Sequence, residues 1–182
     1  MTTLNKNPAK KIPLLLSFIA ALLFSNLAYS NLPYPNLMAQ LKTVGKGELS
    51  WLFMDIYQVS LHSADGRYVH QKYPQALEIR YQRAFKKEWL IKSTGEEWQK
   101  MNVDSQLYKP WLSEFVSLWP DVSSGDTITF LVAKNGQGAF YHNNRLLGNI
   151  KNPDLSSAFL DIWLSKKTSE PDLRRQLIGE IK

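Results

Sequence analysis

The chain of 182 residues contains no cysteine and only three histidines, His62, His70 and His142. Without cysteine it has no disulfide framework, no thiolate metal site and no cysteine nucleophile. Each histidine is alone in its segment, so a metal site would need three distant segments to converge. We therefore predict a protein that holds no metal or other cofactor and is stabilised by its hydrophobic core alone.

The sequence also lacks an apolar run long enough for a typical membrane span. The run over residues 12–24 is shorter than the roughly 20 residues that a transmembrane helix needs. Three lysines precede this run, and the small-x-small motif Ala28-Tyr29-Ser30 follows it. This order is typical of a secretory signal peptide, so residues 1–30 are predicted to be removed after Ser30 and the protein exported to the periplasm. A retained membrane anchor is the alternative.

Blocks of like charge are missing as well. Removing residues 1–30 takes away three lysines and no acid, so Lys plus Arg falls from 22 to 19 against 16 acids and the net charge falls from +6 to +3. The remaining like charges occur as pairs such as Lys86-Lys87 and Arg174-Arg175. Such pairs are typical of solvated helix ends, so we predict no nucleic-acid partner. Residues 31–182 have the length of one domain.

The periodicity of the mature segment predicts an α+β fold. Alternation over Leu77–Arg83 predicts a half-buried strand with Leu77, Ile79 and Tyr81 on one face. The pattern over residues 85–101 predicts one or two short helices interrupted near Ser93-Thr94-Gly95. The pattern over residues 108–119 predicts a further helix with a clearer apolar stripe. A strand over residues 127–133 should lead into two hairpins with turns at 135–138 and 143–144.

Two further helices should begin near Asn152-Pro153 and near Glu170-Pro171. Helices packed over a mainly antiparallel sheet are the arrangement that this order of elements favours. Four apolar residues should be buried beneath those helices: Phe115, Phe159, Ile162 and Leu177.

Several motifs in this order resemble those of the bacterial, exported branch of the chalcone isomerase-like proteins. The resemblance runs from about Leu41 to Leu177. It rests on Val44-Gly45-Lys46-Gly47, Phe53–Leu61 with its central Tyr57, Leu77–Tyr81, Trp119–Asp126, Ala158–Leu164 and Pro171–Arg174. It implies an open-faced sandwich, in which helices cover one face of a large antiparallel sheet and a ligand cleft lies between the two layers.

This family includes enzymes that close a flavonoid ring and relatives that bind fatty acids without catalysis, so membership alone does not decide function. By motif, an arginine of the enzymes falls on Lys46, a tyrosine near Trp98 and a threonine on Ile162. Cyclisation needs positioned hydroxyls to stabilise the developing enolate, and Trp98 and Ile162 carry none. We therefore expect a protein that is not an enzyme and does not isomerise chalcones.

Lys46 and Tyr57 resemble the arginine and tyrosine that hold a carboxylate in the fatty-acid-binding relatives. The resemblance implies a fatty acid or similar apolar carboxylate with its head group at Lys46 and Tyr57 and its tail against Trp98 and Ile162. A hairpin centred at Leu52 would make Lys46 and Tyr57 cross-strand partners.

The sequence leaves other readings open. Lys46 could be exposed at a sheet edge while Tyr57 is a core aromatic residue, and Asp55 could neutralise Lys46. At the level of function, the alternatives are an accessory protein of the cell envelope with a filled cleft, and an isomerase or lyase with an unknown substrate.

Overall fold

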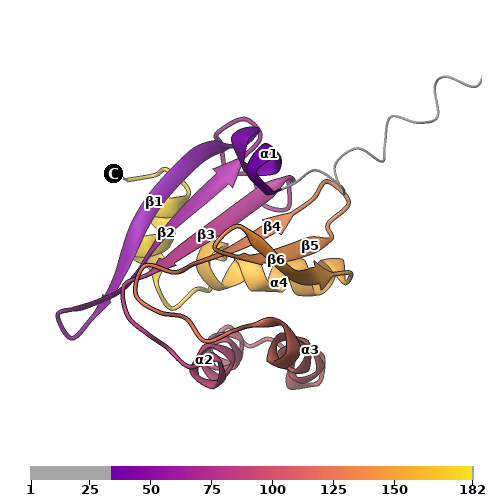
Figure 1. The fold of residues 1–182 in the computed structure, drawn as a ribbon. Coiled ribbons are helices and arrows are strands. Elements are labelled where there is room, and N and C mark those ends of the chain that lie inside the picture. The colour runs from indigo at the N-terminus through magenta and orange to yellow at the C-terminus, as the bar shows by residue number, and fades with distance from the viewer. Residues whose placement is uncertain (1–33, 182) are drawn as a thin grey trace, which may run out of the picture. The chain divides into compact units, whose positions relative to one another are not determined.

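Six antiparallel strands form one sheet in which every strand lies beside its neighbour in the sequence (Figure 1). The structure is a computed structural model that describes residues 34–181, so the predicted signal segment and the boundary at residue 31 lie outside the described residues. The strands are β1 (Lys42–Trp51), β2 (Met54–Ser63), β3 (Gln75–Tyr81), β4 (Thr127–Val132), β5 (Gly138–His142) and β6 (Arg145–Ile150).

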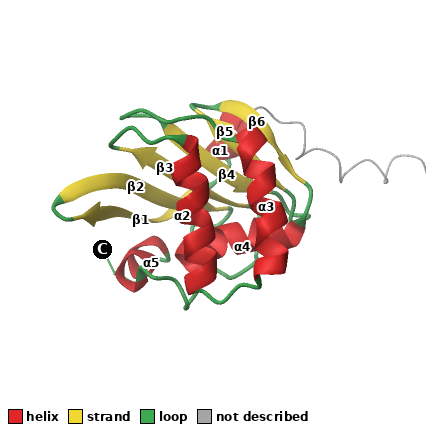
Figure 2. Ribbon diagram, turned by 90° about the horizontal axis from the view of Figure 1, so that it is seen from below, coloured by secondary structure: helices red, strands yellow, loops and turns green. Residues whose placement is uncertain are grey.

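Among the described residues, four helices cover one face of this sheet and one short helix lies on the other (Figures 1 and 2). The covering helices are α2 (Lys87–Lys100), α3 (Ser105–Leu118), α4 (Pro153–Leu164) and α5 (Pro171–Leu177), and α1 (Tyr34–Ala39) packs on the opposite face. No helix within residues 34–181 has both the length and the apolar character needed to cross a membrane. The predicted α+β arrangement, an antiparallel sheet with helices on one face, is confirmed.

Alternate side chains of β3 belong to two different hydrophobic clusters, one on each face of the sheet. Leu77 and Ile79 belong to the large core under the helices, whereas Ala76 packs with Leu37 of α1 on the opposite face. Because successive side chains of a strand point to opposite faces, one strand contributes to both clusters. β3 also pairs with both β2 and β4, which places it in the interior of the sheet.

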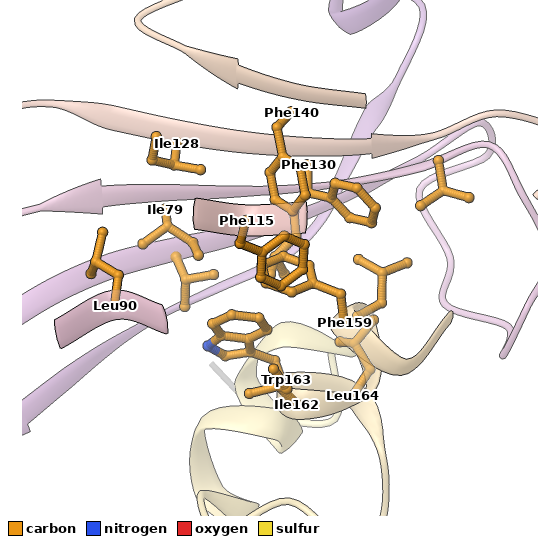
Figure 3. Packing of buried hydrophobic residues seen from close by; sticks show 14 of the residues in the cluster. Ile79, Leu90, Phe115, Ile128, Phe130, Phe140, Phe159, Ile162, Trp163 and Leu164 are labelled. Carbon is orange, nitrogen blue, oxygen red and sulfur yellow. The ribbon is translucent and has the colours of Figure 1, made fainter. Parts of the chain in front are cut away.

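Aromatic rings in mutual contact form one part of the core between the sheet and the helices, together with aliphatic side chains (Figure 3). Phe115 of α3 stacks on Trp119 with 4.4 Å between ring centroids and meets Phe140 and Phe159 edge-on. Edge-to-face and offset contacts of this kind add to the free energy gained by burying the rings. The four residues predicted to be buried, Phe115, Phe159, Ile162 and Leu177, are all buried.

The predicted interruption of the helix at Ser93-Thr94-Gly95 is wrong. α2 runs without a break from Lys87 to Lys100, and the Thr94 hydroxyl donates to the Leu90 carbonyl oxygen at 2.9 Å. A Cβ atom at Gly95 would lie 2.9 Å from Cδ1 of Leu112 in α3. This glycine therefore allows two helices to pack closely and does not end one of them.

The Gly-Lys-Gly segment of β1 has a similar packing role. A Cβ atom at Gly45 would clash with the carbonyl oxygens of Gln176 and Leu177 at the end of α5. At Gly47 it would collide with Leu173 and Gln176 of the same helix. Without side chains at these two positions, β1 lets α5 lie directly against the sheet.

The β1–β2 hairpin turns through two large apolar residues. Leu52 and Phe53 have φ angles of 47° and 64°, which is the left-handed region that two-residue hairpin loops usually fill with asparagine and glycine. For residues with a Cβ atom this conformation costs roughly 1–2 kcal/mol each. The predicted hairpin is present, although its turn contains none of the usual turn residues.

Candidate ligand-binding site

A cavity of about 470 Å³ lies between the sheet and helices α2 and α4. The inner faces of β1, β2 and β3 line one side of it with Leu49, Tyr57 and Tyr81. α2 contributes the row Leu90, Ser93, Thr94 and Glu97, whose spacing of three and four residues places them on one side of a helix. The opening between sheet and helices that the family resemblance implies is therefore present and is mostly apolar.

Tyr57 places a phenol group in the wall of the cavity. Its hydroxyl oxygen accepts a hydrogen bond of 2.9 Å from the indole Nε1 of Trp163. Burial raises the pKa of the Tyr57 phenol well above its usual range, and the bond from Trp163 offsets only part of that rise. The phenol is therefore neutral at physiological pH, and its own proton can be donated to a ligand.

Two neighbouring donors share the cavity with Tyr57. The Tyr81 ring meets the Tyr57 ring edge-on at 6.3 Å, and burial raises the pKa of the Tyr81 phenol as well. The indole Nε1 of Trp119 is buried, and no group among the described residues accepts a hydrogen bond from it. A buried donor without an acceptor costs free energy, so a ligand oxygen that reached it would bring a compensating hydrogen bond.

The rim of the cavity is acidic. Lys100 is the one basic side chain among the described residues that line the cavity, and its Nζ lies 2.7 Å from Oε1 of Glu97. Burial and the nearby Glu97 carboxylate both raise the pKa of Glu170. Because the three carboxylates of Glu96, Glu97 and Glu170 line the cavity with one cation that is already paired, the rim favours a neutral or protonated head group over a carboxylate anion.

The predicted pairing of Lys46 with Tyr57 is wrong. Lys46 is the cross-strand partner of Ser60, and Tyr57 is the partner of Leu49. The loop is centred between Leu52 and Phe53, and a bulge next to Leu49 shifts the register by one more residue. Lys46 is therefore paired with Ser60, three residues beyond the predicted partner Tyr57. Because three is an odd number, the side chains of Lys46 and Tyr57 point to opposite faces of the sheet.

Lys46 instead lies on the outer face, in a shallow hollow shared with Glu48, Glu78 and Arg80. Asp55 does not join it, because the Asp55 carboxylate accepts a hydrogen bond of 2.9 Å from the Ser50 hydroxyl. The hollow carries charges of both signs, so Lys46 offers no single positive site for a carboxylate.

Of the other two predicted site residues, Ile162 lies at the cavity and Trp98 does not. Ile162 lines the cavity together with Tyr57. Trp98, near the end of α2, is fully buried in the core and does not line the cavity, and its Nε1 donates to the Ala158 carbonyl oxygen at 2.8 Å. The cavity thus brings together Tyr57 and Ile162, while Trp98 and Lys46 lie elsewhere.

Three functional candidates were not predicted from the sequence: Tyr81, Trp119 and Trp163. Tyr81 carried a usable signal, since its alternation with Leu77 and Ile79 already placed it on the inner face. Trp163 lies in the apolar stripe of its helix and could not be told from a core residue by spacing. Among residues 34–181 there is no group of three or more side chains suited to hold a metal ion.

Comparisons with known proteins agree with this architecture. A sequence model of the chalcone isomerase-like family matches residues 36–179. The chain is also similar to the crystal structure of a fatty-acid binding protein from Arabidopsis thaliana, with a TM-score of 0.57 and 14% identity over 78% of this chain and 88% of that chain. No curated protein matches the chain. Identity this low shows a shared fold only. Because the family match covers well over half of its length, the chain belongs to the chalcone isomerase-like family.

Proposed function

We propose that this protein binds, without catalysis, a fatty acid or a similar apolar molecule with one oxygen-bearing head group. The observation that carries the proposal is the apolar cavity of about 470 Å³ with the neutral Tyr57 phenol inside it. Its volume lies within the roughly 300–1,000 Å³ typical of small-ligand sites. An accessory protein with a filled cleft would have no such space.

The ligand's head group belongs at Tyr57 and Tyr81, not at Lys46. Tyr57 is already fixed by the bond from Trp163, so its proton points away from that bond and toward an incoming acceptor. The tail would lie against Ile162 and Leu90, which line the same cavity. Burial of the tail supplies most of the affinity, at about 0.8 kcal/mol per methylene.

The fold of the neighbouring structure supports the same class of ligand. That plant protein is a fatty-acid binding protein, and the analogy is one of fold alone. The catalytic alternative has weaker support, because Ile162 offers no hydroxyl and the Trp98 N–H is used by the Ala158 carbonyl.

The Tyr57→Phe variant tests the head-group position. It should bind a long-chain fatty acid about fivefold more weakly by calorimetry, which corresponds to about 1 kcal/mol for one neutral hydrogen bond. A fatty alcohol of equal length should lose a similar amount and should bind wild type at least as tightly, because the acidic rim repels a carboxylate.

Tyr108→Phe is the matched control, since Tyr108 lies on α3 and packs against Trp98 in the core. If both variants bound like wild type, the head group would not be at Tyr57. The ligand should be recovered chemically unchanged after incubation, and a reaction product would contradict the non-catalytic part of the proposal.

We further propose that the protein belongs to the exported, bacterial branch of the family and reaches the periplasm after removal of residues 1–30. The support is the order of lysines, apolar run and small-x-small motif at the N-terminus. The mass of the protein isolated from its native source tests this, and an intact N-terminal segment would contradict cleavage.

A further inference from the structure

The tip of the β1–β2 hairpin exposes three consecutive large apolar residues. Trp51, Leu52 and Phe53 are 63%, 65% and 105% exposed. Figure 1 shows the loop between β1 and β2 reaching beyond the ends of the other strands. Scattered apolar residues on a surface are ordinary, but a contiguous projecting group of this size marks a contact with another phase or partner.

The turn retains these residues against a local conformational preference. Leu52 and Phe53 both have positive φ angles in a two-residue loop where asparagine and glycine would be more stable. Strain of this kind persists where a side chain is needed for another reason. The tip is therefore both exposed and conformationally strained, and a turn made of small polar residues would avoid both costs.

The size and shape of the tip fit a lipid bilayer better than a protein. At their exposures of 63%, 65% and 105%, its three side chains offer on the order of 350–600 Å² of apolar surface, taking about 150–250 Å² for one large side chain. One partner of a standard protein interface contributes about 800 Å². A bilayer needs no complementary shape, and tryptophan and phenylalanine are side chains that favour its interface.

The charges beside the tip indicate which lipid it suits. The Asp55 carboxylate lies directly behind the turn, where it accepts a hydrogen bond from Ser50. Glu48 is also exposed on β1. Acidic groups at this position give no attraction to anionic lipids, so contact with the membrane would rest on the apolar side chains alone.

We propose that the Trp51-Leu52-Phe53 tip inserts into the interfacial region of a zwitterionic lipid bilayer. Trp51 also lines the cavity, as does the exposed Trp89 at the start of α2. Insertion of the tip would therefore hold the rim of the cavity at the membrane surface. This inference goes beyond ligand binding, and its test contains no ligand, so either idea can fail without the other.

The absence of cysteine allows a local test in the full chain. An environment-sensitive fluorophore is attached to the Phe53→Cys variant and, as a control, to Leu146→Cys on the exposed side of β6, where Leu146 is 55% exposed. With phosphatidylcholine vesicles, the probe at position 53 should brighten, shift to shorter wavelength and be quenched by a nitroxide on the upper acyl chain. The probe at position 146 should stay in water.

This readout is local, so membrane binding through residues 1–33 does not imitate it. Equal spectra at positions 53 and 146 in the presence of vesicles would overturn the proposal. A blue shift at position 53 that depends on protein concentration without vesicles would also overturn it, because the tip would then contact a second copy of the chain.

A second variant separates membrane contact from folding. L52N/F53G places the preferred residues in the turn, so it should unfold at a higher temperature than wild type. With the fluorophore at Ser50→Cys, this variant should partition its tip into the vesicles at least tenfold more weakly, since each large apolar side chain is worth on the order of tenfold. Undiminished partitioning of the more stable variant would contradict a role for Leu52 and Phe53.

Discussion

Replacing Phe115 by alanine should lower the free energy of unfolding by about 3–5 kcal/mol, the range for deleting a fully buried aromatic ring. Phe115 is fully buried and contacts rings from α2, α4 and β5 as well as Trp119. Since single domains are stable by roughly 5–15 kcal/mol, this loss removes a large part of the total. Urea denaturation followed by circular dichroism measures it.

Leu146→Ala is the control for this loss. Leu146 is an apolar residue of β6 that is 55% exposed, so its removal should change stability by no more than about 0.5 kcal/mol. If Phe115→Ala were as harmless as the control, the aromatic cluster would not be the centre of the core. Figure 3 shows Phe115 between the sheet and α4, which is the position that the large effect requires.

Ser93→Trp should weaken ligand binding about a hundredfold while leaving the fold intact. Ser93 is a small, half-buried residue on the cavity side of α2. An indole at this position would occupy space for about four methylenes of the ligand tail, worth roughly 3 kcal/mol or about a hundredfold in affinity. The helix itself tolerates tryptophan well.

Ser113→Trp is the matched substitution on the next helix. Ser113 lies on the exposed side of α3 and does not line the cavity. The Ser113→Trp variant should therefore bind ligand like wild type. Both tryptophan variants should show the circular dichroism of the native fold. Binding by Ser93→Trp at wild-type affinity would place the ligand outside this cavity.

Local patterns in the sequence predicted most of the fold. The alternation in β3, the paired turns around β5 and the asparagine cap of α4 depend on neighbouring residues, so they can be read without knowing the rest of the chain. In the structure the Asn152 side chain caps α4 by accepting a hydrogen bond from the Asp154 N–H. The reading of Gly95 failed because a glycine that serves helix packing has the same local signature as one that ends a helix.

The site was harder to predict because it depends on register. Whether Lys46 meets Tyr57 is decided by the position of a two-residue turn and by one bulge, and neither carries a glycine, asparagine or proline that would mark it. A shift by an odd number of residues transfers a side chain to the other face of the sheet. Tyr57 lines the cavity, whereas Lys46, its predicted partner, lies on the outer face of the sheet.

The acidic rim of the cavity should make the binding of a fatty acid depend on pH. Glu97 and Glu170 raise the electrostatic cost of an anion near Tyr57, and burial raises the pKa of Glu170. As the pH falls through that raised pKa, Glu170 takes up a proton and repels a carboxylate less. Binding of an acid should accordingly improve toward lower pH.

Calorimetric titration of the protein with saturated fatty acids of increasing length tests the central claim most directly. If the cavity holds the tail, affinity should rise about fourfold for each added methylene, at about 0.8 kcal/mol each, until the cavity of about 470 Å³ is full, and should then level off. No binding at any length, or an affinity that does not depend on chain length, would contradict a ligand in this cavity.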